Sequence, residues 1–114
     1  MQVVNEKISI AELKKMSEKM FGGFVKAVVD VENEIMVVDA SMHADQEILL
    51  LENGSNQEHL WGINLYPERI GNENWIEFDS MINLRPSWGN RSRGVDDSNI
   101  QKKIRNIVNK LVIK

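Results

Sequence analysis

Two segments of the sequence, residues 60–67 and 75–86, carry polar side chains at alternating positions. If both are strands, they place polar groups on one face and apolar groups on the other. The polar face then carries Asn64, Tyr66, Glu77, Asp79, Asn83 and Arg85. Asparagine is a poor strand former, so Asn64 and Asn83 indicate amides that are used for hydrogen bonding. We predict a binding surface here; the alternative is a solvated sheet face with cross-strand ion pairs.

The segment from Arg85 to Gly94 contains three arginines and two glycines. Arginine binds phosphate and carboxylate groups in a bidentate manner, and glycine lets the backbone approach a ligand closely. The segment does not match the phosphate-binding loop motif, and the acidic pair 96–97 would repel an anion at the next helix start. Two interpretations stay open: the arginines hold an anion, or they pair with the acidic residues of 30–80 and fasten the loop to the sheet. The predicted ligand-binding residues are Asn64, Tyr66, Asn83, Arg85, Asn90 and Arg91.

A small hydrolase acting on a phosphoester or nucleotide is the alternative chemistry. Glu77 or Asp79 would serve as general base, Arg85 or Arg91 would stabilise developing negative charge, and His43 would act as general acid or ligand. The candidate catalytic residues are therefore His43, Glu77, Asp79 and Arg85. Small α+β ribonucleases use such sets, so this hypothesis rests on an analogy between folds.

Metal and cofactor chemistry find little support in the sequence. The chain has no cysteine, which excludes thiolate nucleophiles, iron–sulfur clusters and cysteine zinc sites. Asp39, His43, Asp45 and Glu47 could ligate a divalent ion, but their spacing matches no metal motif. We expect no metal and no cofactor.

Charge is segregated along the 114 residues, whose net charge is −3. Residues 1–29 carry five basic and three acidic side chains, residues 30–80 carry one and twelve, and residues 81–114 carry eight and two. The negative net charge argues against a dedicated nucleic-acid binder, although the last third is basic. The first residues lack the apolar stretch of a signal peptide, and no segment is apolar enough to span a bilayer, so we expect a cytoplasmic protein without a membrane partner.

The elements that position these residues follow from hydrophobic periodicity. Ser9 and Glu12 form a capping box that starts a helix, in which Leu13, Met16, Met20 and Phe21 recur at helical spacing until the glycines 22–23. Residues 24–31 and 35–40 read as an antiparallel hairpin with Val25, Ala27, Val29, Val31, Met36, Val38 and Ala40 facing the core. The segment 44–52 is either a helix or a strand entering a hairpin at the Asn-Gly pair 53–54, and the non-strand residues that follow favour the helix.

A last amphipathic helix covers residues 98–112, with an apolar stripe that includes Ile104, Val108 and Leu111. The predicted fold is therefore a single α+β domain over residues 1–114, in the order αββαββα. We expect a mainly antiparallel four-stranded sheet with the helices packed on its apolar face.

The chain resembles a prokaryotic family of small uncharacterised proteins, classed as a domain of unknown function. The resemblance rests on His43-Ala44-Asp45, on Leu50-Leu51 with Gly54-Ser55, on Trp61 to Pro67, on Ile82 to Pro86 and on Gly89 to Ser92. It covers nearly the whole chain and also favours the helix over residues 44–52. The family implies no activity, so the functional expectation comes from the residues. We expect a non-enzymatic binding or interaction module for an anionic ligand or protein partner, assembled as a homo-oligomer.

Overall fold

The computed structural model describes residues 1–20 and 22–114 and has an α+β architecture. Its α-helices are α1 (Ile10–Glu18), α2 (His43–Glu52) and α3 (Ser98–Leu111). Its strands are β1 (Gln2–Val4), β2 (Ile8–Ser9), β3 (Val25–Asp30), β4 (Ile35–Val38), β5 (Leu60–Leu65), β6 (Ile76–Glu77) and β7 (Val112–Ile113). Short 3-10 turns occupy Gln57–His59, Pro67–Arg69, Glu73–Trp75, Met81–Asn83 and Pro86–Trp88.

The main sheet has five strands in the order β1-β4-β3-β5-β6, and all of its pairings are antiparallel. A second, small parallel sheet joins β2 to β7 and so links the two ends of the chain. The prediction of four strands is therefore wrong. It missed β1, because three residues are too few to show a period, and the parallel pair, because such pairing depends on contacts remote in sequence.

The predicted strand over residues 75–86 is shortened to the two residues of β6. After Glu77 the chain leaves the sheet, and Met81–Asn83 forms a 3-10 turn although its side chains alternate in polarity. Here the side-chain amide of Asn83 pairs with the backbone N–H and C=O of Gly62 in β5. The Asn83 side chain thus forms the hydrogen bonds with β5 that the backbone of a neighbouring strand would otherwise form. The alternating polarity of residues 78–86 therefore does not indicate a strand.

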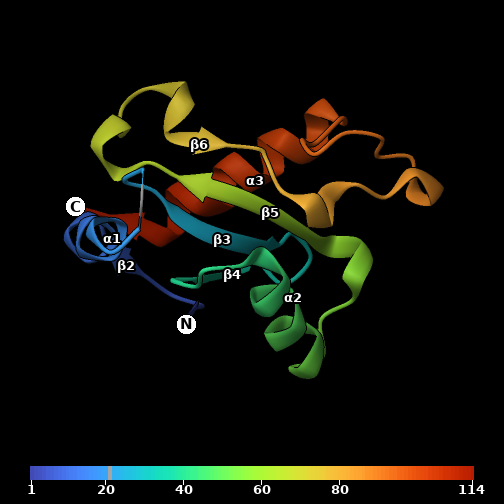
Figure 1. Ribbon diagram of the computed structural model, residues 1–114, viewed down its shortest axis with the longest axis horizontal. Helices are drawn as coiled ribbons and strands as arrows, with labels where there is room; N and C mark the ends of the chain where they lie inside the picture. The colour runs from blue at the N-terminus through green and yellow to red at the C-terminus, as the bar shows by residue number, and fades with distance from the viewer. Residues whose placement is uncertain (21) are drawn as a thin grey trace.

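The helices cover both faces of the sheet, which gives three layers (Figure 1). α1 and α3 pack on the face formed by Val25, Ala27, Val29, Met36, Val38, Trp61, Ile63 and Leu65. These core-facing positions of β3, β4 and β5 are as predicted. On the opposite face, α2 packs through Leu50 on Val28 and Val37. The expectation that all helices share one face is therefore wrong, because Val28 and Val37 make the second face partly apolar.

The first helix begins as predicted. Ser9 Oγ accepts from the Glu12 N–H, and the Glu12 carboxylate accepts from the Ser9 N–H, so the capping box is complete. The helix ends at Glu18, earlier than the predicted stop at the glycines 22–23. Phe21, which was assigned to its apolar face, lies outside the described residues.

A buried carboxylate organises the turn between β3 and β4. Asp30 is fully buried and accepts hydrogen bonds from the Glu32 and Asn33 N–H groups, the Asn33 side-chain amide and the Ser55 hydroxyl. Burial by itself raises the pKa of Asp30, but the hydrogen bonds from Ser55, Asn33 and Glu32 together outweigh it, so the net pKa is lowered.

We expect the Asp30→Asn variant to lose about 2 kcal/mol of its free energy of unfolding at pH 7. The substitution removes the negative charge that strengthens these hydrogen bonds, and it places an amide N–H₂ group against some of the donors that now bond to the carboxylate. Because the folded-state pKa lies below the unfolded value of about 3.9, the carboxylate stabilises the fold above that value. That contribution is lost as the pH falls through the folded pKa. Urea unfolding from pH 7 to pH 2 should show a smaller loss on acidification for the variant than for the wild type. Equal pH dependence would contradict this assignment.

Candidate functional site

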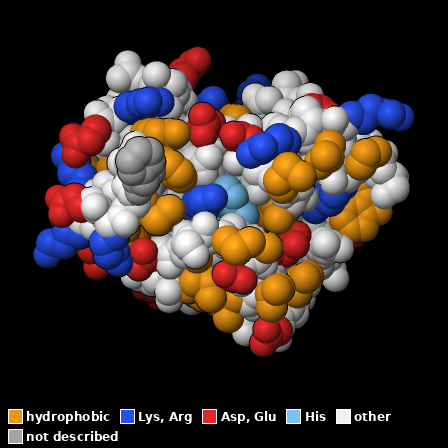
Figure 2. Space-filling model, viewed as in Figure 1, with side chains coloured by type: hydrophobic (Ala, Val, Ile, Leu, Met, Phe, Trp, Pro, Cys, Tyr) orange, Lys and Arg blue, Asp and Glu red, His pale blue; other side chains and the backbone are white. Residues whose placement is uncertain are grey.

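A cleft of about 510 Å³ opens on the face of the sheet that carries α2, beyond the part that α2 covers. It is lined by Phe24, Lys26, Met42, His43, Ala44, Asn64, Tyr66, Glu77, Asp79, Ser80, Met81, Ile82 and Arg93. Figure 2 shows basic, acidic and histidine side chains gathered in a hollow of this face, with hydrophobic side chains around it. The cleft therefore exposes the polar end of a sheet face whose other end is apolar.

A row of three polar side chains crosses the floor of the cleft. Lys26 on β3 is the register partner of Asn64 on β5, and Asn64 is the partner of Glu77 on β6. Strands lie about 4.8 Å apart, so the row runs across the sheet as ammonium, amide and carboxylate. The alternation of β5 places Asn64 on this face because Ile63 and Leu65 face the core.

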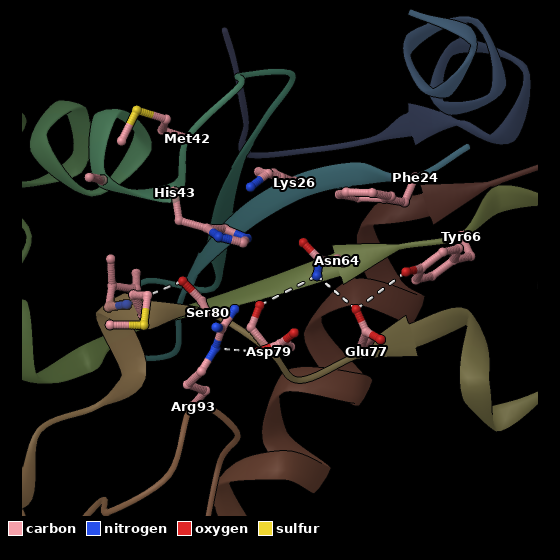
Figure 3. Close-up of a pocket in the computed structure, with 13 residues that line it drawn as sticks. Phe24, Lys26, Met42, His43, Asn64, Tyr66, Glu77, Asp79, Ser80 and Arg93 are labelled. Carbon is pink, nitrogen blue, oxygen red and sulfur yellow. Dashed lines mark hydrogen bonds and ion pairs between the residues drawn. The ribbon is translucent and has the colours of Figure 1, made fainter. Parts of the chain in front are cut away.

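The amide of Asn64 has a fixed orientation. Its nitrogen donates to Glu77 Oε1 at 2.8 Å and to the Asp79 carbonyl at 3.4 Å, and both partners can only accept. The oxygen must therefore point away from them, toward the side of the cleft that carries His43 and Lys26 (Figure 3). Asn64 is 7% exposed, and its Oδ1 is buried and has no hydrogen-bond partner among the described residues. An acceptor left in this state costs free energy, which a ligand N–H or O–H would recover.

Glu77 is held by uncharged donors. Besides Asn64, the Tyr66 hydroxyl donates to Glu77 Oε1 at 3.3 Å. Burial raises the pKa of Tyr66, and the negative charge of Glu77 raises it further, so the phenol stays protonated and keeps donating. The Tyr66 ring also contacts Phe24, with ring centroids 5.5 Å apart, and carries the Arg69 guanidinium 4.0 Å from its centroid. These contacts fix the hydroxyl at the carboxylate.

The two basic groups of the cleft are held differently. Arg93 Nε donates to Asp79 Oδ1 at 2.8 Å, so this pair neutralises itself. Within residues 1–20 and 22–114, the Lys26 ammonium forms no ion pair and no hydrogen bond, although its side chain is half-buried. The cleft thus offers one cation that is free to meet an anion.

His43, the first residue of α2, lies in the cleft and is only 8% exposed. Its Nε2 lies 2.7 Å from the Ile63 carbonyl oxygen, which can only accept, so Nε2 carries the proton. Burial lowers the pKa of His43 and the charges of Lys26 and Arg93 lower it further, against the opposing effects of the Ile63 hydrogen bond and Asp79. The imidazole is therefore neutral at pH 7, with its lone pair on Nδ1.

The structure brings part of the predicted set together. His43, Asn64, Tyr66, Glu77 and Asp79 all line the cleft. Sequence reasoning did not assign Lys26 to the site, and it considered Arg93 only as one of the three arginines of the loop. Lys26 could have been found, because the alternation of β3 places it on the same non-core face that Asn64 occupies in β5.

Asn83 and Asn90, predicted as ligand-binding residues, are buried in hydrogen bonds to the backbone and do not line the cleft. Asn83 pairs with Gly62 and also donates to the Arg93 carbonyl. Asn90 donates to the carbonyls of Asn83, Ser92 and Gly94. Both amides are used for hydrogen bonding, as the sequence indicated, but their partners are backbone groups of β5 and of the loop.

Arg85 and Arg91 also lie away from the cleft. Arg85 donates to the carbonyls of Gln57 at 2.6 Å and Leu60 at 2.8 Å, and its guanidinium lies over the rings of Trp61 and Trp88. Its bonds run to backbone carbonyls and aromatic rings, and they fasten the loop to the start of β5. The Arg91 side chain is exposed. Among the loop arginines, Arg93 forms the pairing with the acidic block that was one of the two interpretations.

Within the described part of the chain, no group of three or more histidine, aspartate or glutamate side chains is arranged to hold a metal ion. Of the four residues considered for a metal, Asp39 is paired with Lys19 at 3.2 Å, and His43 Nε2 is engaged by Ile63.

Comparison with known proteins identifies the family of the chain. The sequence model of a family described as a protein of unknown function, DUF5674, matches residues 2–111. The chain belongs to this family. No curated protein and no solved structure matches it. None of the helices formed by the described residues of this DUF5674 protein is both long and apolar enough to cross a membrane.

Arg85 and Arg91 should respond differently to mutation. We expect Arg85→Ala to destabilise the protein by about 2 kcal/mol, since it removes two charge-assisted hydrogen bonds and contacts with two aromatic rings. Arg91→Ala is the matched control, because an exposed side chain contributes within about 0.5 kcal/mol. Chemical denaturation of both variants measures the difference. Equal stabilities would show that Arg85 does not fasten the loop.

Proposed function

We propose that this DUF5674 protein is a binding module for a small molecule with an anionic group, and that the cleft at Lys26, Asn64 and Arg93 is its binding site. The observation that carries the proposal is the unpaired Lys26 ammonium beside a buried, unpartnered amide oxygen at the floor of a concave surface. A cation that is half-buried without a partner is costly, and an anion would relieve that cost.

Arg93 supports the same assignment. Asp79 engages its Nε, and in the described residues the other guanidinium nitrogens have no hydrogen-bond partner. They remain available to an oxyanion next to Lys26. The cleft walls add apolar contact through Met42, Met81 and Ile82, which is the usual composition of a small-molecule site.

The proposal keeps the anionic ligand expected from the sequence and moves its site. The arginine loop supplies Arg93, while Asn83, Asn90 and Arg85 support the loop from outside the cleft. The expectations of a homo-oligomer in the cytoplasm, and of no nucleic-acid partner, stay predictions. Light scattering of the purified protein tests the first of them.

Lys26→Met tests the proposal, because methionine keeps much of the side-chain volume and removes the charge. Titration calorimetry with inorganic phosphate and with acetate should show binding to the wild type. Loss of one charge-assisted contact should weaken that binding by about ten- to a hundredfold. Lys102→Met, on the exposed face of α3, is the control and should bind as the wild type does. Binding that is unaffected by Lys26→Met would place the anion elsewhere.

A small phosphoester hydrolase is the second candidate, because His43, Glu77 and Asp79 line one cleft. The roles differ from those first assigned to these residues. A neutral His43 with its lone pair on Nδ1 suits a general base better than a general acid. Charge stabilisation would come from Lys26 and Arg93, since Arg85 and Arg91 lie outside the cleft.

His43→Gln tests the hydrolase. A glutamine amide can still donate to the Ile63 carbonyl, so the variant should fold while it lacks a base. If the protein hydrolyses bis(p-nitrophenyl) phosphate, removal of a general base should lower the rate by about 10²- to 10⁴-fold. Turnover that survives the substitution would exclude His43 as the base. If the wild type is inactive, the hydrolase is excluded and only the binding module remains as the proposed function.

A further inference from the structure

We infer that the ligand of the cleft is a zwitterion of the free amino acid type, whose carboxylate meets Lys26 and whose ammonium meets Glu77 and the Asn64 oxygen. This inference deepens the proposed function and rests on it. Its starting point is the charge balance of the cleft, which an anion alone does not satisfy.

Four charged side chains line the cleft, and two of them cancel. Arg93 and Asp79 form an ion pair at 2.8 Å, and His43 is held neutral by its buried position. The remaining charges are those of Lys26 and Glu77, which have opposite sign and no charged partner in the described residues. A simple anion would satisfy Lys26 but would be repelled by Glu77 in the same cleft. A ligand with both charges satisfies both groups.

The register of the sheet arranges these two charges in a line. Lys26, Asn64 and Glu77 are direct neighbours on β3, β5 and β6, so the backbones of Lys26 and Glu77 lie about 10 Å apart across one intervening strand. Asn64 and Tyr66 both donate to Glu77 Oε1. No hydrogen bond within residues 1–20 and 22–114 engages Glu77 Oε2, which leaves this oxygen for a donor of the ligand.

Asn64 supplies the second acceptor. Its oxygen lies in the middle of the row and faces the His43 and Lys26 side of the cleft (Figure 3). None of residues 1–20 and 22–114 donates a hydrogen bond to it. Because that oxygen has no contact with solvent, a ligand N–H reaches it only after a neighbouring side chain moves. Lys26 is directly opposite and flexible, and its move toward the ligand carboxylate would open this path. An ammonium group, with three N–H donors, can serve the Asn64 oxygen and the Glu77 carboxylate together.

The walls of the cleft indicate an apolar side chain on the ligand. Phe24 is half-buried against Tyr66 at one end of the cleft, and Met42 lies at the other (Figure 3). Met81 and Ile82 also line the cleft. Met42 and Met81 are both exposed, which leaves them free to pack on a ligand. Among amino acids, those with apolar or aromatic side chains would bury the most surface here.

The test is titration calorimetry of the full chain with L-phenylalanine, L-leucine and glycine, and with two derivatives of phenylalanine. N-acetyl-L-phenylalanine lacks the ammonium, and L-phenylalaninamide lacks the carboxylate. We expect phenylalanine and leucine to bind more tightly than glycine, and each derivative to bind about ten- to a hundredfold more weakly than phenylalanine.

Two variants separate the charges. Glu77→Gln keeps an oxygen that can accept from Asn64 and Tyr66 but removes the charge. It should therefore weaken the binding of phenylalanine but not that of N-acetyl-phenylalanine, from which it removes a like-charge repulsion. Lys26→Met should weaken the binding of phenylalanine but not that of phenylalaninamide, which lacks the carboxylate and loses a like-charge neighbour. Glu6→Gln, at an exposed position outside the cleft, should bind every probe as the wild type does.

The outcomes distinguish this inference from the proposed function. If phosphate, acetate or N-acetyl-phenylalanine binds in a Lys26-dependent way and none of the free amino acids binds more tightly, the cleft takes anions and the zwitterion inference is overturned. If no probe binds, or if binding ignores Lys26→Met, both the proposed function and the inference fail.

Discussion

The hydrogen bonds between one side-chain amide and the backbone of one residue hold the face that carries the cleft in place. Asn83 Oδ1 accepts from the Gly62 N–H at 2.8 Å, and its Nδ2 donates to the Gly62 carbonyl at 2.9 Å. Gly62 has to be glycine, since an added Cβ would lie 2.5 Å from the Ser80 Cβ. The close approach of residues 80–83 to β5 therefore depends on a missing side chain in the strand and on an amide in the loop. The 3-10 turn Met81–Asn83 is thus hydrogen-bonded to the part of β5 where a further strand would otherwise pair.

The same hydrogen bonds position the ion pair of Asp79 and Arg93 at the cleft. The carbonyl of Arg93 accepts both from Asn83 Nδ2 and from the Ser80 N–H, so the arginine loop is fixed to the same turn. Asp79 and Arg93 consequently face each other, and their carboxylate and guanidinium neutralise one another at the wall. Because the charges of this pair cancel, the electrostatic character of the cleft is set by Lys26 and Glu77, which lie on regular strands. Position in the sheet, more than the loop, therefore sets the net charges that the cleft presents.

Sequence reasoning succeeded where structure is local. The capping box at Ser9, the alternation of β3 and β5 and the apolar stripe of α3 all follow from spacings of two to four residues, and the structure has them. It failed where a side chain forms hydrogen bonds that the backbone of a strand usually forms. Residues 78–86 alternate in polarity like a strand, yet Asn83 is polar because it bonds to Gly62, which no periodicity reveals. Arg85 likewise has the composition of an anion site, but its partners are two carbonyls more than twenty residues away in sequence. Of the site, the sequence indicated the Asn64 amide and the carboxylates of Glu77 and Asp79. It did not reveal the pairing register of β3, β5 and β6, which places Lys26 beside them.

The polar row on β3, β5 and β6 is not explained by stability. Asparagine is unfavourable in mid-strand, and the buried Asn64 oxygen without a partner costs about 1–3 kcal/mol relative to a satisfied acceptor. The other end of the same sheet face shows the stable solution, since Val28 and Val37 are covered there by Leu50 of α2. A second apolar row at Lys26, Asn64 and Glu77 could have been covered in the same way. Residues that are unfavourable for the local structure are found mostly at functional sites. This physical cost, more than the presence of a cleft, is the reason to place function at Asn64 and its two neighbours.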